Sequence, residues 1–355
     1  MSNSNNITMK EEIVEDYTEG LSELLEEAGK VYLDNFPNKT GFERAIFFSW
    51  GCTIGDCKFC YMSIQEKHKQ KEARRGQASI IAEMILCKEL NWDIGFFTGG
   101  INVLSDDEVE FLLTVLNEIA EEKIWLSVGP LSKQRLERYK PLIRGIVGSV
   151  ETVNPVLHDK ICPSKPIKPY EDMFQNAIEL GLERAMTFIV GMGETKEDWP
   201  LFVDFIERNK IEKIHIYGFI PHEGTDMENI PPPSKEQESW WIAKFRIQFP
   251  KLDIQCGIWD DRLDYIPMLL EAGSNSISKL KAMKFFGTDT AKEIVRQAKT
   301  VREEFTSEIV KIPDVDWHKK IDELKSLPEE NKQLVKDKLD IYIKLFNKNI
   351  KKNKL

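Results

Sequence analysis

Three cysteines lie close together near the start of the chain: Cys52, Cys57 and Cys60, in the stretch SWGCTIGDCKFCYMS. Thiolates at this spacing can surround one metal centre without regular secondary structure. A structural zinc site needs four ligands, and the next Cys or His along the chain is His68, within the charged run EKHKQKEARR. Three thiolates on a [4Fe–4S] cluster leave one iron open to a further ligand. We therefore expect a cluster, with zinc or three unligated thiols as the alternatives.

The elements that must position these cysteines follow a regular pattern. From residue 44 onward, short β-branched or aromatic runs alternate with amphipathic stretches, which is typical of βα units around a parallel sheet. The expected strands are 45–50, 93–97, 124–128, 145–150, 185–190, 213–218, 252–256 and 275–278. The expected helices between them are 78–90, 106–121, 132–139, 170–180, 196–209, 235–249 and 265–272. Eight strands over about 240 residues predict an α/β fold of the (β/α)8 TIM-barrel type, with the cysteines at its C-terminal mouth.

The chain divides into three expected parts. Residues 1–41 are an N-terminal helical segment, with one helix over 17–36 that should pack on the main body. Residues 42–282 form the barrel, and residues 283–355 form a helical C-terminal extension with a basic tip. Prolines at 158–169 and 221–234 predict two long loops at the barrel mouth.

Composition narrows the classes of function. The 355 residues are 41% hydrophobic, which suits a large core, and carry a formal net charge of −10, which disfavours nucleic acid as a partner. No apolar run approaches the roughly 20 residues that a membrane span needs, and the N-terminus does not resemble a signal peptide. We expect a cytoplasmic protein without a membrane partner, whose six cysteines are thiols or metal ligands.

The cysteine loop resembles that of the radical S-adenosylmethionine (SAM) superfamily. That family has a C-x3-C-x2-C loop after its first barrel strand, with an aromatic residue before the last cysteine, where this chain has Phe59. The spacing here is C-x4-C-x2-C, one residue longer. The resemblance implies that Cys52, Cys57 and Cys60 hold a [4Fe–4S] cluster whose open iron is chelated by the amino and carboxylate groups of SAM.

Two further motifs resemble the family's cofactor contacts. Thr98, Gly99 and Gly100 end the second expected strand, as in the element that holds the SAM amino group, although Ile101 replaces the acidic residue there. Without the resemblance, the glycines fit an ordinary βα turn equally well. Glu151, in ETVNPVLH, corresponds to a glutamate that contacts the ribose or methionine part of SAM. Its alternative role is a structural salt bridge.

Later strands supply the remaining expected cofactor contacts. Ile189 and Gly191 resemble the element that packs against adenine, and Phe219 and Ile220 resemble the one whose backbone recognises adenine. Related enzymes bind the SAM carboxylate with an arginine where this chain has Met173. Lys168 and Arg184 are the substitutes that the sequence offers.

Tyr217, His222 and Arg262 are candidate substrate contacts at strand ends. Arg262 could grip an anionic substrate or form a surface ion pair with Asp260 or Asp261. We expect His158 and His215 to be structural residues of a loop or of the barrel wall.

The resemblance implies a function. A radical SAM enzyme takes one electron from a donor such as ferredoxin or flavodoxin, cleaves SAM to methionine and a 5′-deoxyadenosyl radical, and abstracts hydrogen from a small-molecule substrate, so it works anaerobically. The motifs are closest to biotin synthase, an [FeFe]-hydrogenase maturase and methylornithine synthase. The longer cysteine spacing points to biosynthesis of the pyridinol ring of the [Fe]-hydrogenase iron-guanylylpyridinol cofactor. The alternatives are a sulfur-inserting enzyme of the biotin or lipoyl synthase type, and a non-catalytic partner protein that binds zinc or a cluster.

Overall fold

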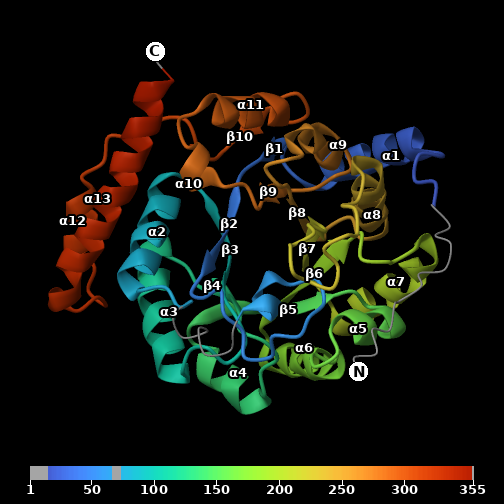
Figure 1. The fold of residues 1–355 in the computed structure, drawn as a ribbon, viewed down its shortest axis with the longest axis horizontal. Coiled ribbons are helices and arrows are strands. Elements are labelled where there is room, and N and C mark those ends of the chain that lie inside the picture. Colours follow the sequence, from blue (N-terminus) through green and yellow to red (C-terminus); the bar gives the residue numbers. More distant parts are fainter. Residues whose placement is uncertain (1–14, 66–72, 354–355) are drawn as a thin grey trace, which may run out of the picture.

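An eight-stranded parallel sheet forms the centre of the computed structural model, which describes residues 15–65 and 73–353. Each strand pairs with the next one along the chain, and Phe42 bridges Ile277 of the last strand, so the sheet curls into a nearly closed barrel. Figure 1 shows the strands in the middle with helices around them. The predicted TIM-type α/β fold is confirmed. The strands are β2 (Glu43–Phe47), β3 (Asp93–Thr98), β4 (Ile124–Ser127), β5 (Ile143–Glu151), β6 (Glu183–Val190), β7 (Lys213–Gly218), β8 (Asp253–Gly257) and β9 (Ser276–Ser278).

Helices cover the outside of the barrel because each one buries an apolar face on the sheet. Several start at a capping residue. Ser105, for example, accepts a hydrogen bond from the Glu108 amide, and the Glu108 carboxylate accepts one from the Ser105 amide. The barrel helices are α2 (Gln77–Glu89), α3 (Asp106–Ala120), α4 (Lys133–Tyr139), α5 (Pro155–Ile161), α6 (Lys168–Leu180), α7 (Trp199–Asn209), α8 (Lys235–Gln248) and α9 (Ile266–Glu271).

The barrel interior changes character from bottom to top. At the bottom, Glu43 binds Lys213 at 2.6 Å and lies 3.4 Å from His215, so this buried carboxylate is paired. Above them lies an apolar layer made of Ala45, Phe96, Trp125, Val147 and Ala185. The inward side chains nearer the mouth are smaller and polar, and include Thr98, Ser127 and Thr187. A polar chamber at the C-terminal ends of the strands follows from this sequence of layers.

One difference from the predicted elements concerns the mouth. Residues 158–161 were expected to belong to a loop but form the end of α5. Asn154 starts this helix by accepting hydrogen bonds from the amides of Val156 and Leu157, and Pro155 occupies its first turn. The second proline-rich loop, 221–234, contains no helix or strand.

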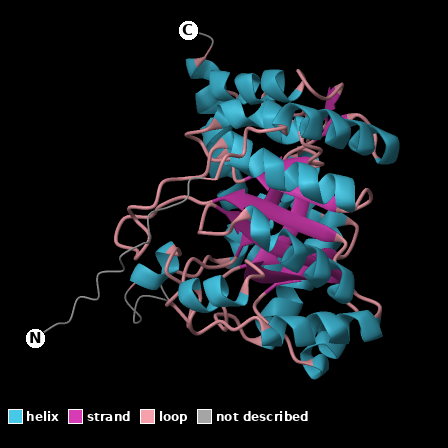
Figure 2. Cartoon of the chain, turned by 90° about the vertical axis from the view of Figure 1, so that its right-hand side faces the viewer, coloured by secondary structure: helices cyan, strands magenta, loops and turns pink. Residues whose placement is uncertain are grey.

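Additional elements flank the barrel on the outside. Helix α1 (Leu21–Asn35) packs on α8 and α9, as expected. After β9 come α10 (Ala282–Phe285), α11 (Asp289–Ala298), α12 (Trp317–Asp322) and α13 (Glu329–Lys352), and Figure 1 shows α13 beside α2. The two-residue strands β1 (Lys39–Thr40) and β10 (Glu304–Phe305) pair with each other. Figure 2 shows the sheet between helical layers, with long loops projecting on one side. Within the described residues, none of the helices is sufficiently long and apolar for a membrane span.

Candidate active site

The cysteine loop connects β2 to α2 and lies at the mouth of the barrel. It rests directly on the turn after β3, because a Cβ atom added to Gly100 would lie 1.6 Å from the carbonyl oxygen of Gly51. Two hydrogen bonds fix this contact, since the amide and hydroxyl of Thr53 both donate to the carbonyl of Ile101, the hydroxyl at 2.9 Å. On the other side, the Lys58 amide donates to the Ile161 carbonyl at the end of α5. The loop is thus held by contacts to the turn after β3 and to the end of α5.

The thiols of the loop are partly accessible. Cys52, Cys57 and Cys60 are half-buried, and the six cysteines, all within the described residues, form no disulfide bond. A hydrogen bond between the Cys57 and Cys162 thiols lowers the pKa of Cys57, whereas burial raises the pKa of Cys60 to about 11. Within the described part of the chain, no three Cys, His, Asp or Glu side chains converge on one metal position. The donor set itself, three thiols on one nine-residue loop at the barrel mouth, fits a [4Fe–4S] cluster.

A fourth thiol, that of Cys162, lies beside the loop, although the spacing of the cysteines in the sequence did not predict this. It follows α5 and is buried beside Cys57, Phe59, Met192 and Phe219 in a small apolar cluster. His68, the ligand considered for a zinc site, lies outside the described residues. Phe59 packs on the same apolar cluster.

The two glycines after β3 are required by close packing. A Cβ atom on Gly99 would lie 2.3 Å from the ring of Phe48, and Gly100 contacts the cysteine loop as described above. Thr98 is buried in the barrel wall beside them. Ile101, which stands in place of the family's acidic residue, packs its side chain close to Gly129 instead of presenting a polar group. Any ligand contact from this turn therefore comes from its backbone or from Thr98.

Glu151 ends β5 with its carboxylate directed into the barrel mouth. Its φ of +67° lies in the left-handed region, which is unusual for a residue with a side chain. Its Oε1 accepts a hydrogen bond from Lys165 Nζ and its Oε2 accepts one from Thr187 Oγ1, both at 2.9 Å. Burial opposes the charge of Lys165, but Glu151, together with Cys162, Tyr170 and Cys57, outweighs it and raises the pKa of Lys165 well above its ordinary value.

Lys165 is a buried cation at the barrel mouth, whereas the position of the family's arginine holds Met173. Met173 is buried inside α6, where its sulfur accepts a hydrogen bond from the Leu131 amide. Neither Lys168 nor Arg184, the two predicted substitutes for this arginine, lies free at the mouth. Lys168 is exposed and pairs with Asp172. Arg184 is at the opposite end of the barrel, near the start of β6, bound to the Lys210 carbonyl and to Glu212.

The ends of β6 and β7 lie side by side. Ile189 pairs with Tyr217 across the two strands, and Phe219 donates its amide to the Val190 carbonyl. Gly191 has a φ of +95°, and its amide donates to Glu194, whose pKa is raised to about 7 by burial. Ile220, the next residue after Phe219, is half-buried at the mouth. The residues expected to contact adenine are therefore brought together.

Arg262 is buried and forms the ion pair with Asp261 that was the alternative to a substrate contact. It is 4% exposed, pairs with Asp261 and donates from Nη1 to the Phe219 carbonyl at 3.3 Å. This arginine supports the segment that contains Phe219. His222 is half-buried, with its ring 5.4 Å from that of Tyr61 just beyond the cysteine loop, and burial lowers its pKa.

Tyr217 faces the chamber and lies beneath Lys279, a residue that motif reasoning did not single out. The Lys279 Nζ is 4.1 Å from the centre of the Tyr217 ring. Lys165, Cys162 and Lys279 follow no family motif, so only the folded chain reveals their position. For Lys279, the sequence offers one indication of its place at the mouth, which is that it directly follows the last predicted strand.

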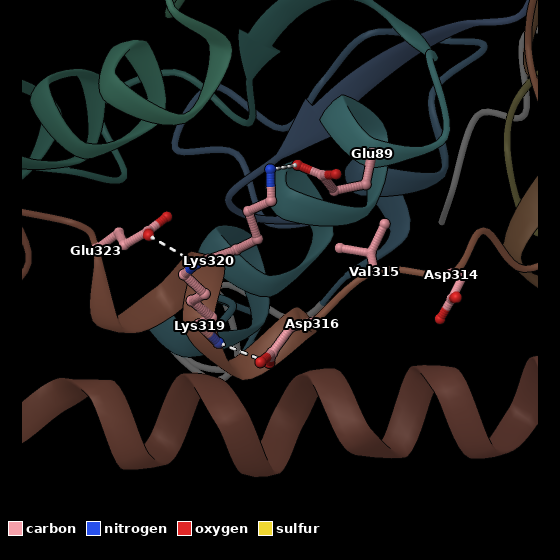
Figure 3. A pocket seen from close by; sticks show the side chains of 7 residues that line it. All are labelled: Glu89, Asp314, Val315, Asp316, Lys319, Lys320 and Glu323. Carbon is pink, nitrogen blue, oxygen red and sulfur yellow. Dashed lines mark hydrogen bonds and ion pairs between the residues drawn. The ribbon is translucent and has the colours of Figure 1, made fainter.

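A charged cleft of about 410 Å³ lies elsewhere, as Figure 3 shows. It is formed by the end of α2 and the start of α12, and Lys320 pairs with Glu89 across it at 3.0 Å. Because α2 runs back from the mouth, its last residue lies at the bottom of the barrel. This cleft is therefore separate from the cysteine loop.

Comparisons with known proteins define the class. The model of the radical SAM superfamily matches residues 46–206, from β2 into α7. An uncharacterized protein of Methanocaldococcus jannaschii is 35% identical to this chain, over a match that covers 81% of this chain and 82% of the relative. A biotin synthase of Clostridium botulinum is 25% identical over 80% of this chain and 91% of its own. The crystal structure of methylornithine synthase has a TM-score of 0.65 at 22% identity, covering 75% of this chain and 79% of its own. The chain belongs to the radical SAM superfamily.

Its cofactors follow from that membership. Radical SAM enzymes bind a [4Fe–4S] cluster and SAM, and this chain is an enzyme of that kind. The (β/α) barrel fold is shared with the methylornithine synthase structure.

Proposed function

We propose that this enzyme binds a [4Fe–4S] cluster through Cys52, Cys57 and Cys60 and uses SAM to abstract hydrogen from a small-molecule substrate in the barrel chamber. The observation that carries the proposal is the position of the three-cysteine loop, which rests on Gly100 at the barrel mouth. When bound, the cluster supplies an electron that cleaves SAM to methionine and a 5′-deoxyadenosyl radical. The electron comes from a small reductant such as a ferredoxin or flavodoxin.

The chain's own residues orient SAM and exclude water. The backbone after Thr98, at Gly99 and Gly100, faces the loop and suits the SAM amino group. The Glu151 carboxylate is fixed by Thr187 and Lys165, so it can accept hydrogen bonds from the ribose or the amino group without reorienting. Lys165, next to it, is the cation that suits the SAM carboxylate. Ile189 and Phe219 pack in one apolar cluster, which suits the adenine ring, with Gly191 and Ile220 close to them along the chain.

The finer assignment is biosynthesis of a cofactor, with the pyridinol ring of the [Fe]-hydrogenase iron-guanylylpyridinol cofactor as the product to which the longer cysteine spacing points. The similarity to biotin synthase keeps sulfur insertion as the alternative within the same superfamily. Sulfur insertion needs a second cluster as sulfur donor. The remaining cysteines, Cys87, Cys162 and Cys256, lie on α2, after α5 and on β8, too dispersed to share one cluster.

The experiment is anaerobic reconstitution with iron and sulfide, followed by iron counting and product analysis after adding SAM and dithionite. We expect about four irons per chain, together with 5′-deoxyadenosine and methionine. Iron near twice that number would favour the sulfur-inserting alternative. Zinc in place of iron, or a bound cluster without 5′-deoxyadenosine, would indicate the non-catalytic partner protein and overturn the proposal.

A further inference from the structure

Lys279 occupies an unusual backbone position at the mouth of the barrel. It directly follows β9, and Ser278 before it faces inward, where its hydroxyl accepts a hydrogen bond from Gln255 at 2.5 Å. In a regular strand the next side chain would point away from the interior. The φ of Lys279 is instead +65°, a left-handed conformation that costs about 1 kcal/mol for a residue with a Cβ atom. This turn brings the lysine over the inward-facing Tyr217.

Aromatic rings surround the side chain of Lys279. Its Nζ lies 4.1 Å from the ring centre of Tyr217, 5.7 Å from that of Trp259 and 5.9 Å from that of Phe47. The absence of a side chain at Gly257 lets the lysine approach, because a Cβ atom there would lie 2.9 Å from its Cγ. Aromatic faces attract an ammonium group, but they carry no compensating charge.

The neighbouring charges at the mouth are paired, whereas Lys279 is not. Glu151 is neutralised by Lys165 at 2.9 Å, and Arg262 pairs with Asp261. Lys281, two residues further on, pairs with Asp260 at 2.6 Å. Among residues 15–65 and 73–353, no hydrogen-bond or ion-pair partner is present for the Lys279 ammonium. A half-buried ammonium that lacks such a partner gains most from an anionic ligand.

We propose that Lys279 binds an anionic oxygen group of the substrate, a carboxylate or a phosphate, and holds the substrate across Tyr217 at the β9 side of the chamber. This inference rests on the proposed function, because it assigns the substrate class of the same chamber. The strained φ of Lys279 places the cation where the ligand arrives, beside β2 and the cysteine loop that follows it. The Glu151–Lys165 pair lies on the β5 side and serves SAM.

The test measures how fast Lys279 reacts with an amine-acylating reagent, by peptide mass spectrometry on the anaerobically reconstituted, SAM-bound protein. The probes are succinate and inorganic phosphate, with chloride at equal ionic strength as the reference and Lys281 as the internal control. We expect one of the two anions to slow acylation of Lys279 saturably by about tenfold, as a charge-assisted contact implies, while Lys281 is unaffected. Protection by succinate identifies a carboxylate site, and protection by phosphate a phosphate site.

Two variants sharpen the result. Lys279→Arg keeps the charge and should retain binding of the protecting anion, whereas Lys279→Met keeps the apolar stem and should weaken it about tenfold. Both should retain the cluster and bind SAM as the unmodified protein does. Equal acylation rates with all three anions would overturn the proposal. Loss of SAM binding in Lys279→Met would also overturn it, by assigning the lysine to the cofactor. Failure of the proposed function is distinguishable, because the unmodified protein would then lack the cluster or bound SAM.

Discussion

Lys165 Nζ lies 2.9 Å from Glu151 Oε1 at the mouth of the barrel, and both side chains are buried. A buried pair of this kind contributes little net stability, because the two desolvation costs offset the attraction. The second oxygen of Glu151 accepts a hydrogen bond from the Thr187 hydroxyl, which fixes the plane of the carboxylate. Under the proposed function, the pair orients the amino-acid end of SAM.

The variant Lys165→Met should affect both the stability of the fold and the binding of SAM, and the two effects can be measured separately. Without the lysine, Glu151 is a buried and unpaired charge, so the free energy of unfolding should fall by about 3–5 kcal/mol. SAM binding to the reconstituted protein should weaken about tenfold or more. Thermal unfolding and equilibrium dialysis measure the two effects.

The double variant Glu151→Gln with Lys165→Met serves as the control, because it removes both charges. It should recover much of the stability and none of the SAM affinity. If the double variant bound SAM normally, the pair would have only a structural role.

The two neighbouring thiols Cys57 and Cys162 should respond differently to removal. Cys57→Ala should lose the cluster and with it the production of 5′-deoxyadenosine, because two thiolates cannot hold a [4Fe–4S] cluster. Cys162→Ala should keep the iron content and the characteristic visible absorption, since its thiol contacts Cys57 without belonging to the loop. Iron counting after reconstitution is the measurement. A Cys162→Ala protein without iron would indicate a four-cysteine site.

Gly100→Ala should displace the cysteine loop. The new Cβ atom would lie 1.6 Å from the Gly51 carbonyl oxygen, and backbone cannot move aside cheaply there. We expect a lower iron content and a loss of stability of about 1–3 kcal/mol. Gly76→Ala is the matched control, since a Cβ atom at Gly76 meets nothing within 4 Å. Equal iron contents in the two variants would contradict the close packing of the loop.

The reactivity of Lys279 should depend on pH in a specific window. Burial lowers its pKa to about 8, the cation of Arg44 acts in the same direction, and Glu151 and Cys60 partly offset them. Only the neutral amine is nucleophilic, so acylation should rise up to about pH 8 and level off above it, whereas an ordinary lysine continues to gain up to roughly pH 10. A pH series of the acylation experiment checks this. A midpoint near 10 would show that the lysine is solvated in solution.

The barrel could be predicted because its strands are short runs of buried β-branched and aromatic residues with amphipathic helices between them. The cysteine loop, Gly99, Gly100 and Glu151 could be placed because each directly follows such a strand. Lys165 and Cys162 could not be placed, because both lie in the segment 158–169, interpreted as a proline-rich loop, whereas α5 extends to Ile161 and brings both residues close to Cys57. Arg184 was misplaced because it is the second residue of β6 and lies at the end of the strand opposite the mouth.

The seam between the first and last strands has a consequence for synthesis of the enzyme. Phe42 bridges Ile277 there, with the cysteine loop following β2 on one side and Lys279 following β9 on the other. A ribosome releases the thiols long before it releases this lysine. The three cysteines are therefore available to iron and sulfide before the barrel closes, and β9 with Lys279 is added last.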